Sequence, residues 1–169
     1  MSAASSARRC SERGLTVWCG EGFAEQRRTS GKRSRSVGVL GRNQAMKALV
    51  VDDEPVMRRV VERTLTDMGV EAVSETSGLN ALYRVHEQPF DLVFMDLMMP
   101  GGNGVYAIEE VLKRRPGTRI VAITGLATDE IVAKALERGA ESRLRKPFST
   151  HVIRETVERV RRESDGGTA

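Results

Sequence analysis

The chain has 169 residues, enough for one domain of ordinary size, with 27 Lys and Arg against 23 Asp and Glu. The excess of positive charge lies in residues 1–45, which hold nine basic and three acidic residues, whereas residues 46–169 hold 18 and 20. The net charge of +4 therefore gives no reason to expect a nucleic-acid surface on the folded part.

Residues 1–45 are predicted to be a flexible basic leader, because they are rich in Ser, Gly and Arg and show no sustained apolar periodicity. They lack the apolar core of a secretory signal, and no later stretch is long enough to cross a bilayer. Cys10 and Cys19 fit neither a disulfide framework nor a zinc site. We expect a cytoplasmic protein whose folded domain begins at Met46, with the leader either a genuine extension or a start assigned too early.

From Met46 onward, short apolar runs alternate with segments of helical periodicity, the pattern of successive βα units around a parallel sheet. The expected strands are Lys47–Val51, Val70–Ser74, Phe90–Met95, Arg119–Ile123 and Ser142–Arg145. The expected helices are Pro55–Met68, Gly78–Glu87, Val105–Arg115, Ala127–Arg138 and one from Ser149 to about Arg162. In the first helix, Val56, Val60, Leu65 and Met68 fall on one stripe and should face the core.

Acidic, hydroxyl and basic side chains gather where the strands end. The first strand is followed by Asp52 and Asp53, the third by Asp96, the fourth by Thr124 and the fifth by Lys146. We predict an α/β, flavodoxin-like doubly wound (βα)5 sandwich, with a five-stranded parallel sheet in the order 2-1-3-4-5. Ligands of such folds bind at the carboxyl ends of strands one and three, where three carboxylates would meet.

Three neighbouring carboxylates repel one another in a low dielectric, so either some take up protons or a cation neutralises them. Mg²⁺ is the simpler answer, because it prefers oxygen ligands and commonly uses one or two carboxylates plus a phosphate. A metal beside Asp96 would also make this carboxylate usable as a phosphoryl acceptor. Thr124 and Lys146 would supply the remaining hydrogen-bond donors.

Each of these residues has a simpler explanation when it is taken alone. Asp53 ahead of Pro55 could be a helix N-cap, and Asp96 could be a turn residue. Thr124 could be a local turn hydroxyl, and Lys146 a solvated surface charge. Independent explanations would not place all of them at the same end of successive strands, so a shared site is favoured.

Over residues 46–169 the motifs resemble, in order, those of the receiver domains of bacterial response regulators. ALVVDDEP resembles the first-strand motif with its acidic pair, and DLVFMDLMMPGGNG resembles the phosphoacceptor strand and loop. VAITG resembles the fourth strand with its hydroxyl residue, and RLRKPF the fifth-strand lysine motif. The resemblance implies a single-domain, chemotaxis-regulator-like protein of two-component phosphorelay signalling.

The resemblance further implies that Asp96 accepts a phosphoryl group from a histidine kinase or a histidine phosphotransfer protein. The implied ligands of Mg²⁺, or of Mn²⁺, are Asp52, Asp53, Asp96 and the backbone carbonyl of Met98. Such a protein catalyses only its own phosphorylation and dephosphorylation, and it signals to a downstream protein. We expect the chain itself to have neither a DNA-binding domain nor a membrane anchor.

In the family, the residues that correspond to Thr124 and Lys146 bind the phosphoryl group, and the peptide bond before Pro147 is cis. The face formed by the fourth and fifth units then changes shape. One position departs from the pattern, since Arg143 stands where the family usually has the Tyr or Phe that rotates inward on activation. A switch that couples Thr124 to an aromatic side chain is therefore not expected in its usual form.

Two further positions flank the phosphoryl group in the family, and here they hold the apolar residues Met98 and Leu126. We expect them to shield the acyl phosphate from water and slow its hydrolysis, unless they only pack against neighbouring loops. A haloacid-dehalogenase-type phosphatase is a competing interpretation, but it would need a second Asp where Met98 stands. An inactive receiver-like interaction module is the other, although such modules usually lack an acidic residue or the lysine.

Overall fold

The computed structural model describes residues 45–100 and 104–165, in which five strands alternate with five helices. The strands are β1 (Lys47–Val51), β2 (Glu71–Glu75), β3 (Leu92–Asp96), β4 (Arg119–Thr124) and β5 (Ser142–Arg145). The helices are α1 (Pro55–Asp67), α2 (Gly78–Glu87), α3 (Gly104–Arg114), α4 (Asp129–Glu137) and α5 (Thr150–Asp165). All neighbouring strands are parallel, in the order β2-β1-β3-β4-β5, which confirms the predicted fold.

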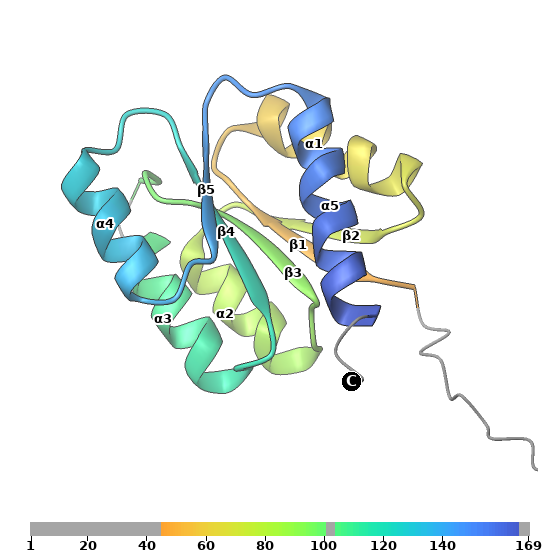
Figure 1. The fold of residues 1–169 in the computed structure, drawn as a ribbon. Helices are drawn as coiled ribbons and strands as arrows, with labels where there is room; N and C mark the ends of the chain where they lie inside the picture. Colours follow the sequence, from red (N-terminus) through yellow and green to blue (C-terminus); the bar gives the residue numbers. More distant parts are fainter. Residues whose placement is uncertain (1–44, 101–103, 166–169) are drawn as a thin grey trace, which may run out of the picture. The chain divides into compact units, whose positions relative to one another are not determined.

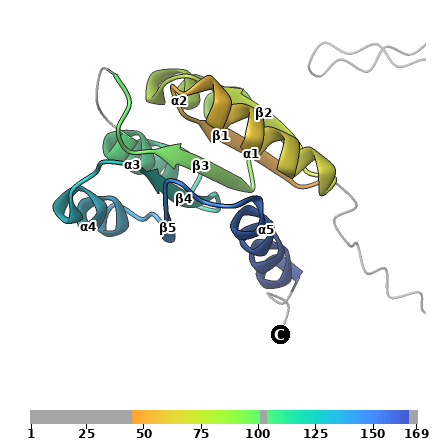
Figure 2. The same cartoon turned by 90° about the horizontal axis from the view of Figure 1, so that it is seen from above.

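Helices cover both faces of the sheet, with α1 and α5 on one face and α2, α3 and α4 on the other (Figure 1). Figure 2 shows the same layers from above, with α3 and α4 on one side of β4 and β5, and α5 on the other. Successive side chains of a strand point to opposite faces, so each central strand contributes to two cores. In β3, Phe94 packs toward α1 and α5, whereas Met95 packs toward α2, α3 and α4.

The stripe predicted for α1 is partly wrong. Leu65 is fully buried, but Val56 and Val60 are 65% and 39% exposed. The buried face consists instead of Val61, Thr64 and Leu65. The Thr64 hydroxyl donates to the Val60 carbonyl at 2.8 Å, so this polar side chain can be buried with its hydrogen bond formed. A pattern of apolar residues alone does not predict a threonine at a core position.

The fourth helix begins at Asp129, two residues later than expected, because Ala127 belongs to a turn. The Ala127 N–H donates to the Thr124 hydroxyl oxygen at 3.2 Å, and Thr128 then caps the helix by accepting from the Ile131 N–H. The third strand also runs one residue further than expected and ends at Asp96 itself.

Some predicted features lie outside the described residues. These are residues 1–44 of the predicted leader, with Cys10 and Cys19, and residues 101–103 of the glycine-rich loop. In the part of the chain that the structure describes, no helix is both long and apolar enough to span a bilayer.

Gly104, the first residue of α3, lies against the end of β3. A Cβ atom there would collide with the backbone carbonyl oxygen of Asp96 and lie 2.7 Å from the Leu97 Cα. We therefore expect Gly104→Ala to lower the free energy of unfolding by about 1–3 kcal/mol. This is opposite in sign to the gain of about 1 kcal/mol that alanine usually gives over glycine in a helix.

Urea unfolding, monitored by circular dichroism, measures this change in the free energy of unfolding. Gly117→Ala is the matched control, because nothing lies within 4 Å of a Cβ at that position. Its unfolding free energy should change by less than about 1 kcal/mol. A Gly104→Ala variant as stable as the native chain would show that the contact with Asp96 relaxes without cost.

Candidate functional site

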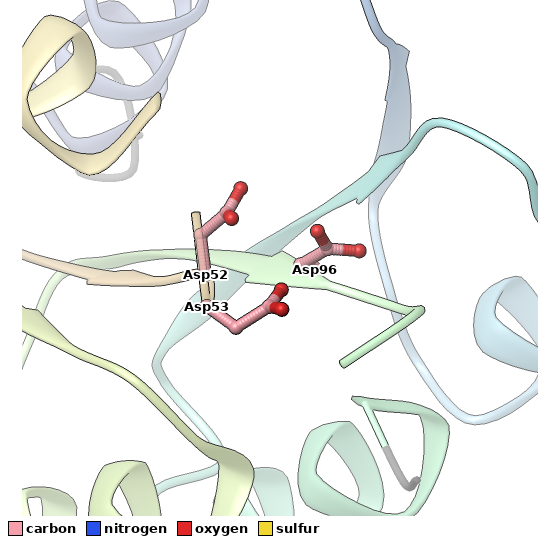
Figure 3. A group of neighbouring side chains, drawn as sticks. All are labelled: Asp52, Asp53 and Asp96. Carbon is pink, nitrogen blue, oxygen red and sulfur yellow. The ribbon is translucent and has the colours of Figure 1, made fainter. Parts of the chain in front are cut away.

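Three carboxylates meet at the carboxyl edge of the sheet. Asp52 and Asp53 follow β1, Asp96 ends β3, and these two strands are hydrogen-bonded neighbours. One carboxylate oxygen from each residue lies within 4.8 Å of the others (Figure 3). Asp52 and Asp96 are buried, whereas Asp53 is exposed. The cluster therefore has two carboxylates in the protein interior and one that faces solvent.

Lys146 reaches this cluster from the end of β5, one of the two edge strands of the sheet. Its Nζ donates to Oδ2 of Asp96 at 2.6 Å and lies 2.7 Å from Oδ2 of Asp52. The side chain is only 16% exposed, so Lys146 is not a solvated surface charge. Its backbone N–H donates to the Thr124 carbonyl at 2.7 Å, and its peptide bond to Pro147 is cis.

The local explanations for Asp96 and Thr124 hold together with the shared site. Oδ1 of Asp96 accepts from the Met98 N–H at 2.8 Å, which closes a turn after β3. The Thr124 hydroxyl oxygen accepts from the Ala127 N–H, as described above. For Asp96 the turn uses Oδ1 and leaves Oδ2 to accept from Lys146, so the local role and the shared site are compatible.

The N-cap explanation for Asp53 does not hold. Glu54 occupies the N-cap position of α1 and makes no side-chain capping bond. The carboxylate that supports this turn belongs to Asp52, whose Oδ1 accepts from the Glu54 N–H at 2.8 Å. The Asp53 carboxylate is therefore not committed to the helix terminus.

Among residues 45–100 and 104–165, the contacts of the cluster with Lys146 do not balance its charge. Three ionised carboxylates and one ammonium leave an excess of two negative charges, and burial raises the pKa of Asp52 in spite of the adjacent Lys146. Burial alone would lower the pKa of Lys146, but its close contacts with the carboxylates of Asp52 and Asp96 outweigh this and raise it. Lys146 is thus a cation held by both buried carboxylates.

Oδ2 of Asp52 is buried and accepts no hydrogen bond from the described residues. Lys146 Nζ lies close enough to it for an ion pair, but the angle is not that of a hydrogen bond. A buried carboxylate oxygen without a donor, beside two further carboxylates, suits a hard divalent cation with oxygen ligands. The residues present therefore fit a Mg²⁺ or Mn²⁺ ion.

Two residues of this region were not predicted from the sequence. Arg58, in α1, donates from its guanidinium to the backbone carbonyl of Asp52 at 2.6 Å, and the Glu54 carboxylate lies 3.9 Å from Lys146 Nζ. A cation near the N-terminus of a helix is unfavourable against the helix dipole, which is the signal that could have drawn attention to Arg58. Its contact holds the chain at the turn between Asp52 and α1.

The three other residues singled out from the sequence lie around the site at the surface. The Met98 side chain is 47% exposed and Leu126 is 91% exposed, so Leu126 does not simply pack against a neighbouring loop. Arg143 is exposed and lies 3.7 Å from Oδ1 of Asp129, at the start of α4. It is directed along the α4 side of β5, toward Asp129.

Residues 48–158 match the family model described as the response regulator receiver domain. The chemotaxis protein CheY of Thermotoga maritima is 32% identical over 115 residues, which cover 68% of this chain and 96% of that protein. The response regulator protein PilR of Pseudomonas aeruginosa is 34% identical over 111 residues, 66% of this chain and only 25% of that longer protein.

Among solved structures, chemotaxis protein CheY4 of Vibrio cholerae superposes with a TM-score of 0.65 at 29% identity, over 69% of this chain and 99% of that one. A CheY-like receiver domain protein of Methanospirillum hungatei has a TM-score of 0.69 at 24% identity, over 73% and 100% of the two chains, which supports the fold alone. The match of the family model across most of the described residues, together with these relatives, shows that the chain belongs to the response regulator receiver domain family.

Proposed function

We propose that residues 46–169, without a contribution from residues 1–45, accept a phosphoryl group on Asp96 in the cytoplasm. The donor is a histidine kinase or a histidine phosphotransfer protein, and the transfer requires Mg²⁺ or Mn²⁺. One observation carries the proposal: the buried Asp96 carboxylate lies 2.6 Å from Lys146 Nζ, inside a three-carboxylate cluster with an excess of negative charge.

Asp96 is the nucleophile in this proposal. A bond forms between one of its carboxylate oxygens and phosphorus, while the bond from phosphorus to the donor's histidine nitrogen breaks and its electron pair stays on that nitrogen. Lys146, already hydrogen-bonded to Oδ2 of Asp96, is placed to donate to a phosphoryl oxygen. The reaction is mainly a matter of position and charge, for which a buried, preorganised ammonium is well suited.

Thr124 supplies a second donor. Its oxygen already accepts from the Ala127 N–H, and a hydroxyl keeps its own proton available for one further acceptor. The strand end that carries it is bonded to the next one, since the Leu97 N–H donates to the Ile123 carbonyl at 2.9 Å. A phosphoryl group on Asp96 would therefore have two candidate donors, Thr124 at the end of the adjacent strand β4 and Lys146 after β5.

The metal ligands in this proposal are Asp52, Asp53, Asp96 and the backbone carbonyl of Met98. When bound, the ion supplies the positive charge that the cluster lacks. Arg58 supports this arrangement because it fixes the backbone of Asp52 from outside the cluster. The signal would then leave through the face made of α4, β5 and α5, which the turn from Thr124 to Ala127 connects to the site.

The two competing functions have less support. A phosphatase of the haloacid-dehalogenase type needs an acid where the chain has Met98. An inactive interaction module has no need for Asp52, Asp53, Asp96 and Lys146 to meet, and the described fold brings all four together.

The first test is labelling with a small donor such as acetyl phosphate, read as a mass increase of the intact protein. We expect labelling with Mg²⁺ or Mn²⁺ and none in excess chelator, because the carboxylate cluster must be neutralised. Asp96→Asn should abolish the label, while His151→Ala, on the exposed side of α5, should leave it unchanged. Label that persists in Asp96→Asn would mean that another residue is the acceptor.

Metal binding can be tested without phosphorylation, through stability. Because burial raises the pKa of Asp52, its ionised form disfavours the folded, metal-free state above that pKa. In chelator at mildly alkaline pH, Asp52→Asn should therefore raise the free energy of unfolding, by on the order of 1 kcal/mol. The gain should disappear as the pH falls through the raised pKa, where the native carboxyl takes up a proton.

Added Mg²⁺ should reverse the order of the two proteins. At about a hundred times the dissociation constant, the native chain should gain about 2.7 kcal/mol, and Asp52→Asn much less. Asp53→Asn is the matched control, because the exposed Asp53 should show the reduced response to Mg²⁺ without the gain in chelator. An Asp52→Asn variant that is less stable in chelator would contradict the argument from buried charge.

The lifetime of the acyl phosphate tests the role of Met98 and Leu126. Neither side chain can hold an attacking water by a hydrogen bond, so we expect slow loss of the phosphoryl group after the donor is removed. Met98→Asn and Leu126→Glu should each speed the loss, by roughly tenfold if the barrier falls by 1.36 kcal/mol. Leu79→Glu, at an exposed position of α2, is the control. Unchanged rates in the single and double variants would show that these residues do not shield the site.

A further inference from the structure

Arg58 is a residue of α1 whose side chain reaches back to the end of β1. Its guanidinium donates to the backbone carbonyl of Asp52 at 2.6 Å, and its own backbone N–H donates to the Glu54 carbonyl at 3.1 Å. Arg58 is half-buried, whereas the next residue, Arg59, is exposed. The arginine therefore spans the turn that carries Asp52 and Asp53.

The carbonyl group that Arg58 holds lies beyond the last hydrogen bonds of the strand. β1 ends at Val51, and within residues 45–100 and 104–165 no backbone N–H donates to the Asp52 carbonyl. Asp52 is completely inaccessible to solvent, so its carbonyl needs a donor from the protein. The guanidinium supplies this donor and extends the hydrogen bonding of the strand by one peptide unit.

The same peptide unit contains the N–H of Asp53. A peptide unit is planar, so a hydrogen bond to its carbonyl restrains the orientation of the whole unit. The preceding unit is held because the Asp52 N–H donates to the Glu75 carbonyl at 3.2 Å. The following unit is held because the Glu54 N–H donates to Oδ1 of Asp52 at 2.8 Å. Asp53 thus lies between restrained peptide units, which set the direction in which its side chain leaves the chain.

The Asp53 carboxylate depends on this support more than the other two carboxylates do. Hydrogen bonds hold Oδ1 of Asp52 and both carboxylate oxygens of Asp96. In the described part of the chain, no hydrogen bond or ion pair holds the exposed carboxylate of Asp53. Asp52 and Asp53 leave the chain in different directions (Figure 3). The position of the Asp53 carboxylate is therefore set through its backbone.

The charge of Arg58 and its hydrogen bond act on metal binding in opposite directions. The residue lies in the first turn of α1, where the helix dipole disfavours a positive charge. A positive charge near the carboxylates also opposes the binding of a further cation. The contribution of Arg58 to a metal site must therefore come from geometry, and the two effects can be separated by experiment.

We propose that Arg58 is a positioning residue that raises the affinity of the site for Mg²⁺ relative to the larger Ca²⁺. The inference rests on the proposed function, in which Asp53 is a metal ligand. Mg²⁺ requires a nearly regular octahedron with ligands at about 2.0–2.1 Å, whereas Ca²⁺ accepts flexible arrangements at about 2.3–2.6 Å. With its peptide unit held by Arg58, Asp53 is restrained from moving outward to suit the larger ion. Arg58 itself touches neither the metal nor the phosphoryl group.

A purely structural role for Arg58 has different consequences. Its bond also ties α1 to the end of β1, so loss of the bond should lower the free energy of unfolding of the metal-free chain in either case. The ratio of the dissociation constants for Ca²⁺ and Mg²⁺ distinguishes the two roles. A change in net charge acts alike on two ions of the same charge, and a loss of stability alone leaves the folded site unchanged.

Three variants of the full chain separate charge from geometry. Arg58→Met keeps an unbranched side chain but removes both the charge and the donors. Arg58→Lys keeps the charge and a donor group, and so it is the conservative rescue. Arg59→Met is the matched control, because it removes the same charge from the neighbouring exposed position of α1.

Isothermal titration calorimetry with Mg²⁺ alone and with Ca²⁺ alone measures the two dissociation constants of each protein. Arg58→Met should bind Mg²⁺ roughly tenfold more weakly than the native chain, as is usual when a residue that orients a metal ligand is lost. Binding of Ca²⁺ should weaken by a smaller factor, so the ratio falls. Arg58→Lys should recover most of the affinity for Mg²⁺, and Arg59→Met should keep the native ratio.

Urea unfolding in excess chelator establishes that each variant is folded under the conditions of the titration. If Arg58→Met does not fold, Arg58→Gln, with a shorter and uncharged side chain, takes its place with the same expected order. Equal weakening for both ions, or unchanged or tighter binding of Mg²⁺ without Arg58, would overturn the proposal. So would a control that loses the preference for Mg²⁺ as strongly as Arg58→Met.

Labelling with acetyl phosphate separates this inference from the proposed function. At limiting Mg²⁺ the Arg58→Met variant should be labelled more slowly than the native chain, and saturating Mg²⁺ should restore most of the rate. If the native chain binds Mg²⁺ but is not labelled, the proposed function fails, while the ratio of dissociation constants still decides the role of Arg58. If it is labelled and the ratio is unchanged in Arg58→Met, this inference alone is overturned. A native chain that binds no Mg²⁺ would overturn both.

Discussion

The repulsion among Asp52, Asp53 and Asp96 is the constraint on which the rest of the site depends. Parallel strands that end at one edge of the sheet force these carboxylates within 4.8 Å of one another, and two of them are buried. Lys146 supplies one compensating charge from two strands away. The remaining excess of negative charge destabilises the fold at this point and favours binding of a cation.

Such a cluster needs a rigid support, since isolated strand ends would move apart. β1 and β3 are hydrogen-bonded along their length, and helices bury them from both faces. The large apolar residues at the ends of these strands, among them Val51 and Met95, are completely inaccessible to solvent. Burial of side chains of this size stabilises a fold by roughly 1.5–3 kcal/mol each, so a few of them offset the cost of one strained charged group. The apolar strands therefore make the acidic edge possible.

The sequence was sufficient for the strands and for the residues at their ends, because both follow from apolar runs that stop at charged or hydroxyl residues. The strand order was predicted from the doubly wound fold that such βα units form. It was insufficient where a polar residue is buried in the core in place of an apolar one, and where a side-chain hydrogen bond keeps a residue out of a helix. Thr64 replaces Val60 in the core because its hydroxyl is bonded within its own helix, and Ala127 leaves α4 because the Thr124 oxygen captures its N–H. Arg58 was missed because its partner is a backbone carbonyl, and only its unfavourable position near the N-terminus of a helix marks it in the sequence. Each miss concerns a short-range hydrogen bond, between residues three to six positions apart, whose formation depends on the local backbone conformation.

Thr124 connects the acidic edge to the outer surface through a single hydroxyl group. Its oxygen holds the Ala127 N–H, and only Thr128 separates that residue from Asp129, the neighbour of Arg143. A phosphoryl group on Asp96, as proposed, would compete for the position of this hydroxyl from inside, while the ion pair between Arg143 and Asp129 restrains the same segment from outside. In receivers with an aromatic residue at the position of Arg143, that side chain can rotate inward and fill the space left when the residue corresponding to Thr124 moves. The charge of Arg143 makes its burial without a partner unfavourable. In this chain we therefore expect a shift of Thr124 to change the ion pair between Arg143 and Asp129 at the surface.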